Sequence, residues 1–107
     1  MTIIAPADCS TMAEVRAGVD QVDRELVALL VRRFGYMDAA ARIKPARGAV
    51  RDEARKAVVI AAAEAEAVAA GLPARTIADL WERLVELSIA HELAAFDRRV
   101  GGAVDQD

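Results

Sequence analysis

Residues 10–44 read STMAEVRAGVDQVDRELVALLVRRFGYMDAAARIK, and their apolar side chains recur at alternating spacings of four and three. This heptad spacing is typical of a helix with one apolar seam. The seam contains Val15, Val19, Val22, Leu26, Leu29, Arg33, Tyr36, Ala40 and Ile43. The guanidinium of Arg33 keeps its charge, so its burial requires anionic or hydrogen-bonding partners. The seam is therefore either a packing surface with one costly residue or the wall of a site for an anion.

The two ends of this helix are marked in the sequence. Ser10 or Thr11 followed by Glu14 forms a capping-box pattern, and Pro45 stops the helix after Lys44 because it has no backbone N–H to donate. About 30 residues give a helix roughly 45–50 Å long. Such a helix needs partners along its whole length, and a second copy of the chain is the simplest source.

Composition predicts one all-α domain over residues 1–107. Ala, Val and Leu dominate the apolar residues, and no alternating β-branched run is long enough to predict a strand. The net charge of −3 argues against a nucleic-acid surface, and a single Cys9 and a single His91 make neither a disulfide framework nor a metal site. No signal peptide or membrane-length apolar run is evident, so we expect a cytoplasmic protein that binds no membrane.

Three helices are predicted, and Gly and Pro residues separate them. The elements are an extended lead-in over 1–9, the first helix over 10–44, a loop over 45–50, a second helix from Arg51 or Asp52 to Ala70 with Gly71 as C′ residue, and a third helix from Pro73 until Gly101 and Gly102 end it in a frayed tail over 101–107. Cys9 is expected to be a buried contact or a passive surface thiol. Trp81 and Phe96 are expected in the core, and His91 is expected to pack without an evident partner.

Cations on the first helix suggest a site that one chain cannot complete. Arg33 and Lys44 are eleven residues apart, so they project from nearly the same side about 16 Å apart along the helix. Arg16 lies roughly 42 Å from Lys44 along the same helix, too far for one small molecule to bridge. If two copies of the helix pair antiparallel, Arg16 of one chain comes near the Arg33 to Lys44 interval of the other.

Further polar residues on the second and third helices complete a candidate set. Ser88 and Glu92 lie one turn apart beside the apolar face of the third helix, where a carboxyl either reaches solvent or becomes protonated in a partly dry site. The candidates are Arg16, Arg33, Lys44, Asp52, Arg55, Ser88 and Glu92. They include no activated nucleophile, metal-ligand set or Gly-rich phosphate loop. Such a set suits a small polyanion and a reaction that needs positioning and charge stabilisation.

From Asp8 to about Arg99 the chain resembles the all-helical (AroQ-class) chorismate mutases and their relatives, the isochorismate pyruvate lyases. The order and spacing of several short segments carry the resemblance: Asp8-Cys9-Ser10, Met12-Ala13-Glu14-Val15-Arg16, Asp20 to Asp23 with Leu26 and Leu29, Arg32-Arg33, Ala41-Arg42-Ile43-Lys44, Val50-Arg51-Asp52 with Arg55, and Ser88 with Glu92. It implies an intertwined helical homodimer in which each active site takes an arginine from the neighbouring chain. It also implies a reaction without cofactor or metal.

The resemblance implies a role for each candidate residue. Arg16 is similar to the arginine donated across the dimer to a substrate carboxylate, Arg33 to the cation at the other carboxylate, and Lys44 to the lysine at the ether oxygen and a carboxylate. Asp52 is similar to the acid near the ring hydroxyl, Arg55 to a further site arginine, and Ser88 to a substrate-contacting serine. Glu92 takes the position of the second ether-oxygen donor, commonly a glutamine.

Two departures from the family pattern affect the expected chemistry. Glu92 can donate a hydrogen bond only when protonated, and Lys56 stands where many mutases carry a glutamate that contacts the ring hydroxyl. The expected activity is rearrangement of chorismate to prephenate. The alternatives are cleavage of isochorismate to salicylate and pyruvate, and a non-catalytic helical dimerisation module whose arginines face solvent.

Overall fold

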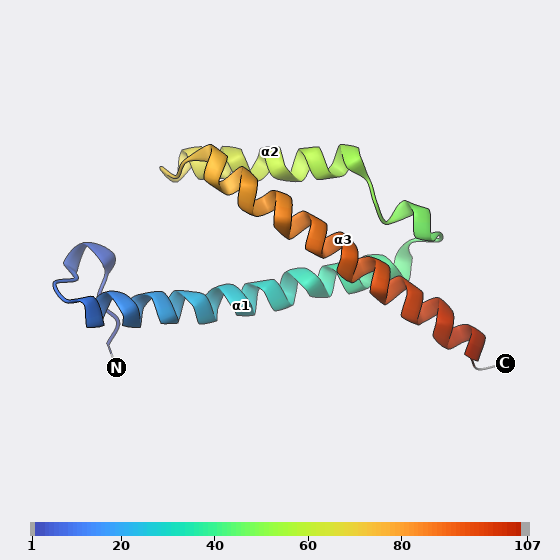
Figure 1. Cartoon of the computed structure of the whole chain (residues 1–107), viewed down its shortest axis with the longest axis horizontal. Coiled ribbons are helices and arrows are strands. Elements are labelled where there is room, and N and C mark those ends of the chain that lie inside the picture. Colours follow the sequence, from blue (N-terminus) through green and yellow to red (C-terminus); the bar gives the residue numbers. More distant parts are fainter. Residues whose placement is uncertain (1, 106–107) are drawn as a thin grey trace. The chain divides into compact units, whose positions relative to one another are not determined.

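The computed structural model describes residues 2–105, and all of its regular elements are helical (Figure 1). The elements are the 3-10 turn η1 (Pro6–Asp8), the helix α1 (Met12–Ile43), the 3-10 turn η2 (Arg47–Ala49), and the helices α2 (Glu53–Ala69) and α3 (Ala74–Asp105). The all-α prediction with three helices is confirmed, but the prediction that one of them is long is wrong, since α1 and α3 have 32 residues each. The contacts divide the chain into two units, the first ending at Gly35 and the second beginning at Tyr36, and each is described by itself.

In the first unit, side-chain and backbone hydrogen bonds cap the N-terminus of α1. The Glu14 carboxylate accepts hydrogen bonds from the backbone N–H groups of Ser10 at 2.9 Å and Thr11 at 3.0 Å, while the Thr11 hydroxyl accepts from the Glu14 N–H at 3.2 Å. This reciprocal pattern is the predicted capping box. The hydrogen bonds from Ser10 and Thr11 lower the pKa of Glu14, because they stabilise its charged form.

The lead-in folds back beside the start of α1. The sequence predicts an extended lead-in. Part of it is not extended, because the turn η1 closes through a hydrogen bond from the Cys9 N–H to the Pro6 carbonyl at 3.3 Å. The Cys9 thiol is partly buried and lies 3.8 Å from the Ile4 carbonyl. The lead-in and the apolar seam residues Val15, Val19 and Val22 together line a cavity of about 530 Å³.

In the second unit, a tight turn joins α2 to α3 (Figure 1). Asp52 caps α2 by accepting from the Arg55 N–H at 2.9 Å, and α2 ends in a Schellman motif, in which Leu72 N–H bonds to the Ala67 carbonyl at 2.8 Å. Gly71 takes the left-handed conformation that this motif needs, with φ of 82°. The Gly71 position matches the sequence prediction, whereas Asp52, expected at the start of the helix and in the candidate site, was not predicted as its N-cap.

The end of α3 differs from the prediction. Gly101 and Gly102 were expected to stop the helix, but α3 continues through them to Asp105, and residues 106 and 107 of the expected tail lie outside the described residues. A glycine lowers helix stability by only about 1 kcal/mol and keeps its N–H donor, so two glycines do not by themselves terminate a long helix.

The core of the second unit sits where α2, α3 and the residue after η2 meet. Val50, Val85 and Ile89 are buried together, and Val59, Ile60 and Leu93 pack against them. Phe96 is also buried, as predicted. This core fixes α3 beside the residues that follow α1.

Among residues 2–105, no helix is both long and apolar enough to span a membrane.

Candidate functional site

The most buried charged group in the described chain is on α3. Glu92 is 4% exposed, and Ser88, one helical turn earlier, is 3% exposed. The Ser88 hydroxyl donates to the Leu84 carbonyl on its own helix at 2.6 Å. A buried carboxylate needs a charged or hydrogen-bonding partner to offset its lost hydration. The sequence left open whether Glu92 reaches solvent, and the structure shows that it does not.

Lys44 is the partner of Glu92. Its ammonium Nζ donates to Glu92 Oε2 at 2.6 Å and lies 3.4 Å from the Val50 carbonyl oxygen. The two side chains come from positions 48 residues apart in sequence. The structure therefore brings together two of the predicted site residues as a close ion pair, with the buried Ser88 on the same helix as Glu92.

A second polar side-chain contact joins the end of α1 to α3 next to this pair. His91 Nε2 lies 2.7 Å from the Asp38 carboxylate, so the expectation that His91 has no evident partner is wrong. The helical periodicity of α3 placed His91 beside the site but gave no information about which residue of α1 it meets. The contact fixes α3 against the last turns of α1, close in sequence to both Lys44 and Glu92.

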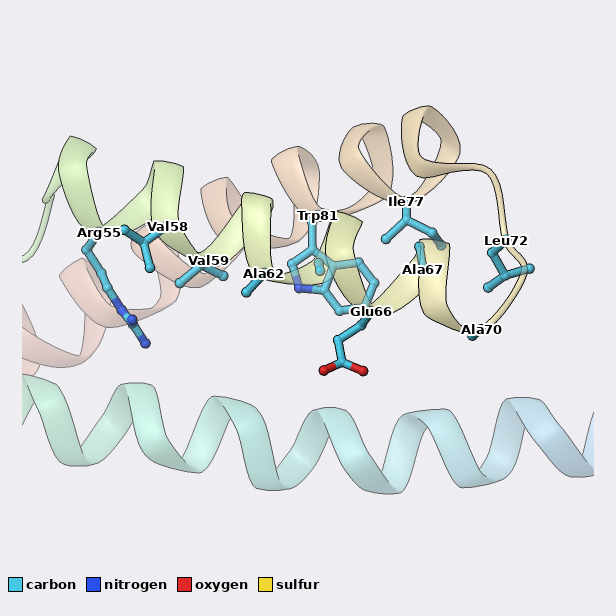
Figure 2. A pocket seen from close by; sticks show the side chains of 11 residues that line it. Arg55, Val58, Val59, Ala62, Glu66, Ala67, Ala70, Leu72, Ile77 and Trp81 are labelled. Carbon is cyan, nitrogen blue, oxygen red and sulfur yellow. The ribbon is translucent and has the colours of Figure 1, made fainter.

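Asp52 and Arg55, two further predicted site residues, are not part of the Lys44–Glu92 ion pair. The Asp52 carboxylate caps α2 through the Arg55 N–H, and the Arg55 side chain stands at one end of a groove along α2 and α3 (Figure 2). The groove has a volume of about 560 Å³ and is lined mainly by small apolar residues with Trp81. Trp81 was expected in the core but lines this groove. Within residues 2–105, neither Asp52 nor Arg55 bonds to the Lys44–Glu92 pair.

Arg16 and Arg33 belong to the first unit. Arg16 is exposed on α1. Arg33 is half-buried, and burial lowers its pKa, because an apolar environment disfavours the charged form. Burial at this seam position therefore disfavours the charged guanidinium, as the sequence predicts.

Lys56 is held by carboxylates of α3. Its ammonium donates to Glu82 at 2.6 Å and to Glu86 at 2.9 Å, and Glu86 also accepts two bonds from Arg51 at 2.9 and 3.1 Å. Lys56 thus replaces the expected family glutamate with a cation that two glutamates neutralise. Sequence reasoning missed this network, because the partners lie on different helices.

This network predicts acid sensitivity of the fold. Hydrogen bonds from Arg51, and then from Lys56, lower the pKa of Glu86 from 4.5 to about 2. A carboxyl whose pKa is lower in the folded state stabilises the fold above its unfolded pKa, and this contribution is lost as the pH falls through the folded value. We expect the Tm to decrease between pH 4.5 and about 2, and Glu86→Gln to reduce that decrease.

Thermal unfolding followed by circular dichroism across this pH range measures the effect. Glu64→Gln, an α2 carboxyl outside every ion pair of the described residues, is the control. If the Tm of Glu86→Gln fell with pH as much as the Tm of the wild type, the acid sensitivity would not come from Glu86. Across residues 2–101, whose side chains are described, no group of three or more His, Cys, Asp or Glu residues gathers to hold a metal ion.

Comparison with known proteins adds two findings. The family pattern described as chorismate mutase type II matches residues 15–93. An isochorismate pyruvate lyase from Pseudomonas aeruginosa is 29% identical over 98 residues, which cover 92% of this chain and 97% of that protein. The matched range contains α2 and both members of the Lys44–Glu92 pair, and it confirms the resemblance seen in the sequence. The chain belongs to the chorismate mutase type II family.

Proposed function

We propose that this protein is a chorismate mutase, which rearranges chorismate to prephenate. The observation that carries the proposal is the Lys44 ammonium held at 2.6 Å by the buried Glu92 carboxyl. Chorismate is a dianion with an enolpyruvyl ether, and its rearrangement breaks the ether C–O bond while a C–C bond forms. Negative charge grows on the ether oxygen, so fixed donors beside that atom lower the barrier.

Lys44 supplies the first of these donors. An ammonium group has three N–H donors. Its partners among residues 2–105 are Glu92 Oε2 and the Val50 carbonyl, so one donor is left for the ether oxygen or a substrate carboxylate. Since two protein contacts already fix the ammonium, little reorganisation is needed when substrate binds.

Glu92 supplies the second donor when it is protonated. In the structure it accepts from Lys44, so a proton must be added before it can donate to the ether oxygen. The acid form of Glu92 is therefore the active one in this proposal.

This role predicts a pH effect. We expect the wild-type kcat/KM to fall as the pH rises from mildly acidic to alkaline, because only the acid form of Glu92 can donate to the ether oxygen. Glu92→Gln keeps the shape and donates at every pH, so its profile is expected to be flat. The measurement is chorismate depletion by ultraviolet absorbance across this range, and a wild-type rate that does not change with pH would show that protonation of Glu92 is not needed.

The proposal includes a homodimer in which Arg16 reaches the partner's site. Seam side chains on α1 are exposed in the single chain, with Val19 at 52%, Leu26 at 51% and Leu29 at 55%. An exposed apolar row at heptad spacing is a typical dimer surface. Pairing of two such seams supports two equivalent sites, each with Arg33, Lys44 and Glu92 from one chain and Arg16 from the other.

Isochorismate pyruvate lyase is the second candidate activity, and the Pseudomonas aeruginosa relative favours it. Cleavage of isochorismate to salicylate and pyruvate breaks the same type of ether bond, so the same cations and donors serve both reactions. Assaying the two substrates side by side separates them, because salicylate fluorescence reports the lyase directly. Turnover of chorismate alone supports the mutase. Turnover of neither substrate would leave a non-catalytic dimerisation module.

A further inference from the structure

The end of α1 leaves a buried backbone carbonyl without its helical partner. In a continuing α-helix the Ala41 carbonyl would accept from the N–H of residue 45, but residue 45 is proline and has none. Ala41 is 2% exposed, so water does not readily replace the missing donor. The carbonyls of the following residues, including Lys44 itself, also lie beyond the last helical bond.

Arg99 on α3 supplies the missing donors. Its Nε donates to the Ala41 carbonyl at 3.2 Å, and its Nη2 donates to the Lys44 carbonyl at 3.3 Å. The guanidinium carbon lies 4.9 Å from the centre of the Phe96 ring, and Phe96 is buried. A planar fork held on a fixed ring is suited to bind two carbonyls in one orientation.

We propose that Arg99 is a positioning residue for Lys44: it replaces the donor that Pro45 lacks and so fixes the direction of the catalytic lysine. The inference rests on the proposed function for its catalytic consequence, but its geometry does not depend on it. Proline already restricts the backbone of the residue before it. With its carbonyl bound by Arg99, Lys44 keeps its side chain directed toward Val50 and Glu92.

Arginine is needed at this position for a geometric reason. A lysine would keep the positive charge but has a single terminal nitrogen, which does not match two carbonyls in fork geometry. Arg98, the neighbouring residue, is exposed and makes no side-chain hydrogen bond or ion pair among the described residues. Arg98→Ala therefore removes the same charge from the same helix without touching the α1 end, and serves as a matched control.

The first measurement is steady-state kinetics on the substrate that the wild type turns over. A misplaced catalytic group loses rate rather than substrate affinity, so Arg99→Ala is expected to lower kcat about tenfold with a change in KM of less than about threefold. Arg99→Lys is expected to fall between wild type and Arg99→Ala. Arg98→Ala is expected to match wild type.

The second measurement observes Lys44 without substrate. The chain has only two lysines, Lys44 and Lys56, so protein labelled with carbon-13 at lysine Cε gives two NMR signals, which Lys56→Arg assigns. Arg99→Ala and Arg99→Lys are expected to shift the Lys44 signal and leave the Lys56 signal in place. Lys56 pairs with Glu82 and Glu86 and acts as an internal control.

The outcomes separate this inference from the proposed function. A Lys44 signal that moves in the Arg99 variants but not in Arg98→Ala supports positioning. A Lys44 signal and a kcat that are the same in Arg99→Ala and Arg98→Ala overturn it. If Arg99→Ala does not fold, Arg99→Lys carries the same comparison. If the wild type turns over neither substrate, the proposed function fails and the Lys44 signal alone decides the positioning role.

Discussion

Lys44→Ala is expected to lower kcat/KM by about 10³-fold. Removal of one fixed donor from a site of developing negative charge costs about 10²–10³-fold in rate. The change also removes the cation that faces the buried Glu92. In the proposed mechanism, the ether oxygen and a substrate carboxylate both lose a favourable charge. The loss should appear in kcat as well as in KM, because the donor acts most strongly in the transition state.

Chorismate depletion with purified protein measures this loss. Circular dichroism checks that helicity is kept, since Glu92 loses its counter-ion in the variant. Arg75→Ala is the control: Arg75 is on α3, its side chain is 92% exposed, and its 4.0 Å contact with Asp79 is weak. A Lys44→Ala enzyme within about tenfold of the wild type would remove Lys44 from the mechanism, since even one oxyanion donor is worth more.

Arg16→Ala is expected to lower kcat/KM by about 10²-fold, since the proposed role of Arg16 is one charge-assisted contact to a substrate carboxylate. Arg16 is exposed on α1 and makes no side-chain bond within residues 2–105, so folding of the chain should not change. Arg24→Ala is the matched control on the same helix, where Arg24 donates to the Gln21 side chain at 2.7 Å. Equal activities of the two variants would exclude Arg16 from the site.

The local features of the fold could be predicted from the sequence. The capping box at Glu14 and the helix end at Gly71 depend on residues within a few positions of one another. Such signals are readable because the partners are fixed by helix geometry. The end of α3 was misplaced, because a glycine pair weakens a helix without removing any hydrogen-bond donor.

Contacts between helices were harder to predict. Periodicity assigned Glu92 and His91 to a face of the third helix, but the partners Lys44 and Asp38 lie 48 and 53 residues away. Pro45 predicted where α1 ends, yet the donor that satisfies its last carbonyls, Arg99, is 58 residues from Ala41. Sequence spacing gives the face of a helix, whereas the partner across the interface depends on how the helices cross.

Subunit complementation tests the shared site most directly. Lys44→Ala and Arg16→Ala chains are co-expressed with different affinity tags, and the dimer that carries both tags is purified. If each site takes Arg16 from the partner and Lys44 from its own chain, one of the two sites is intact, so the mixed dimer should recover about half of the wild-type activity. A mixed dimer no more active than its parent variants, or a protein that stays monomeric, would contradict a site assembled from two chains.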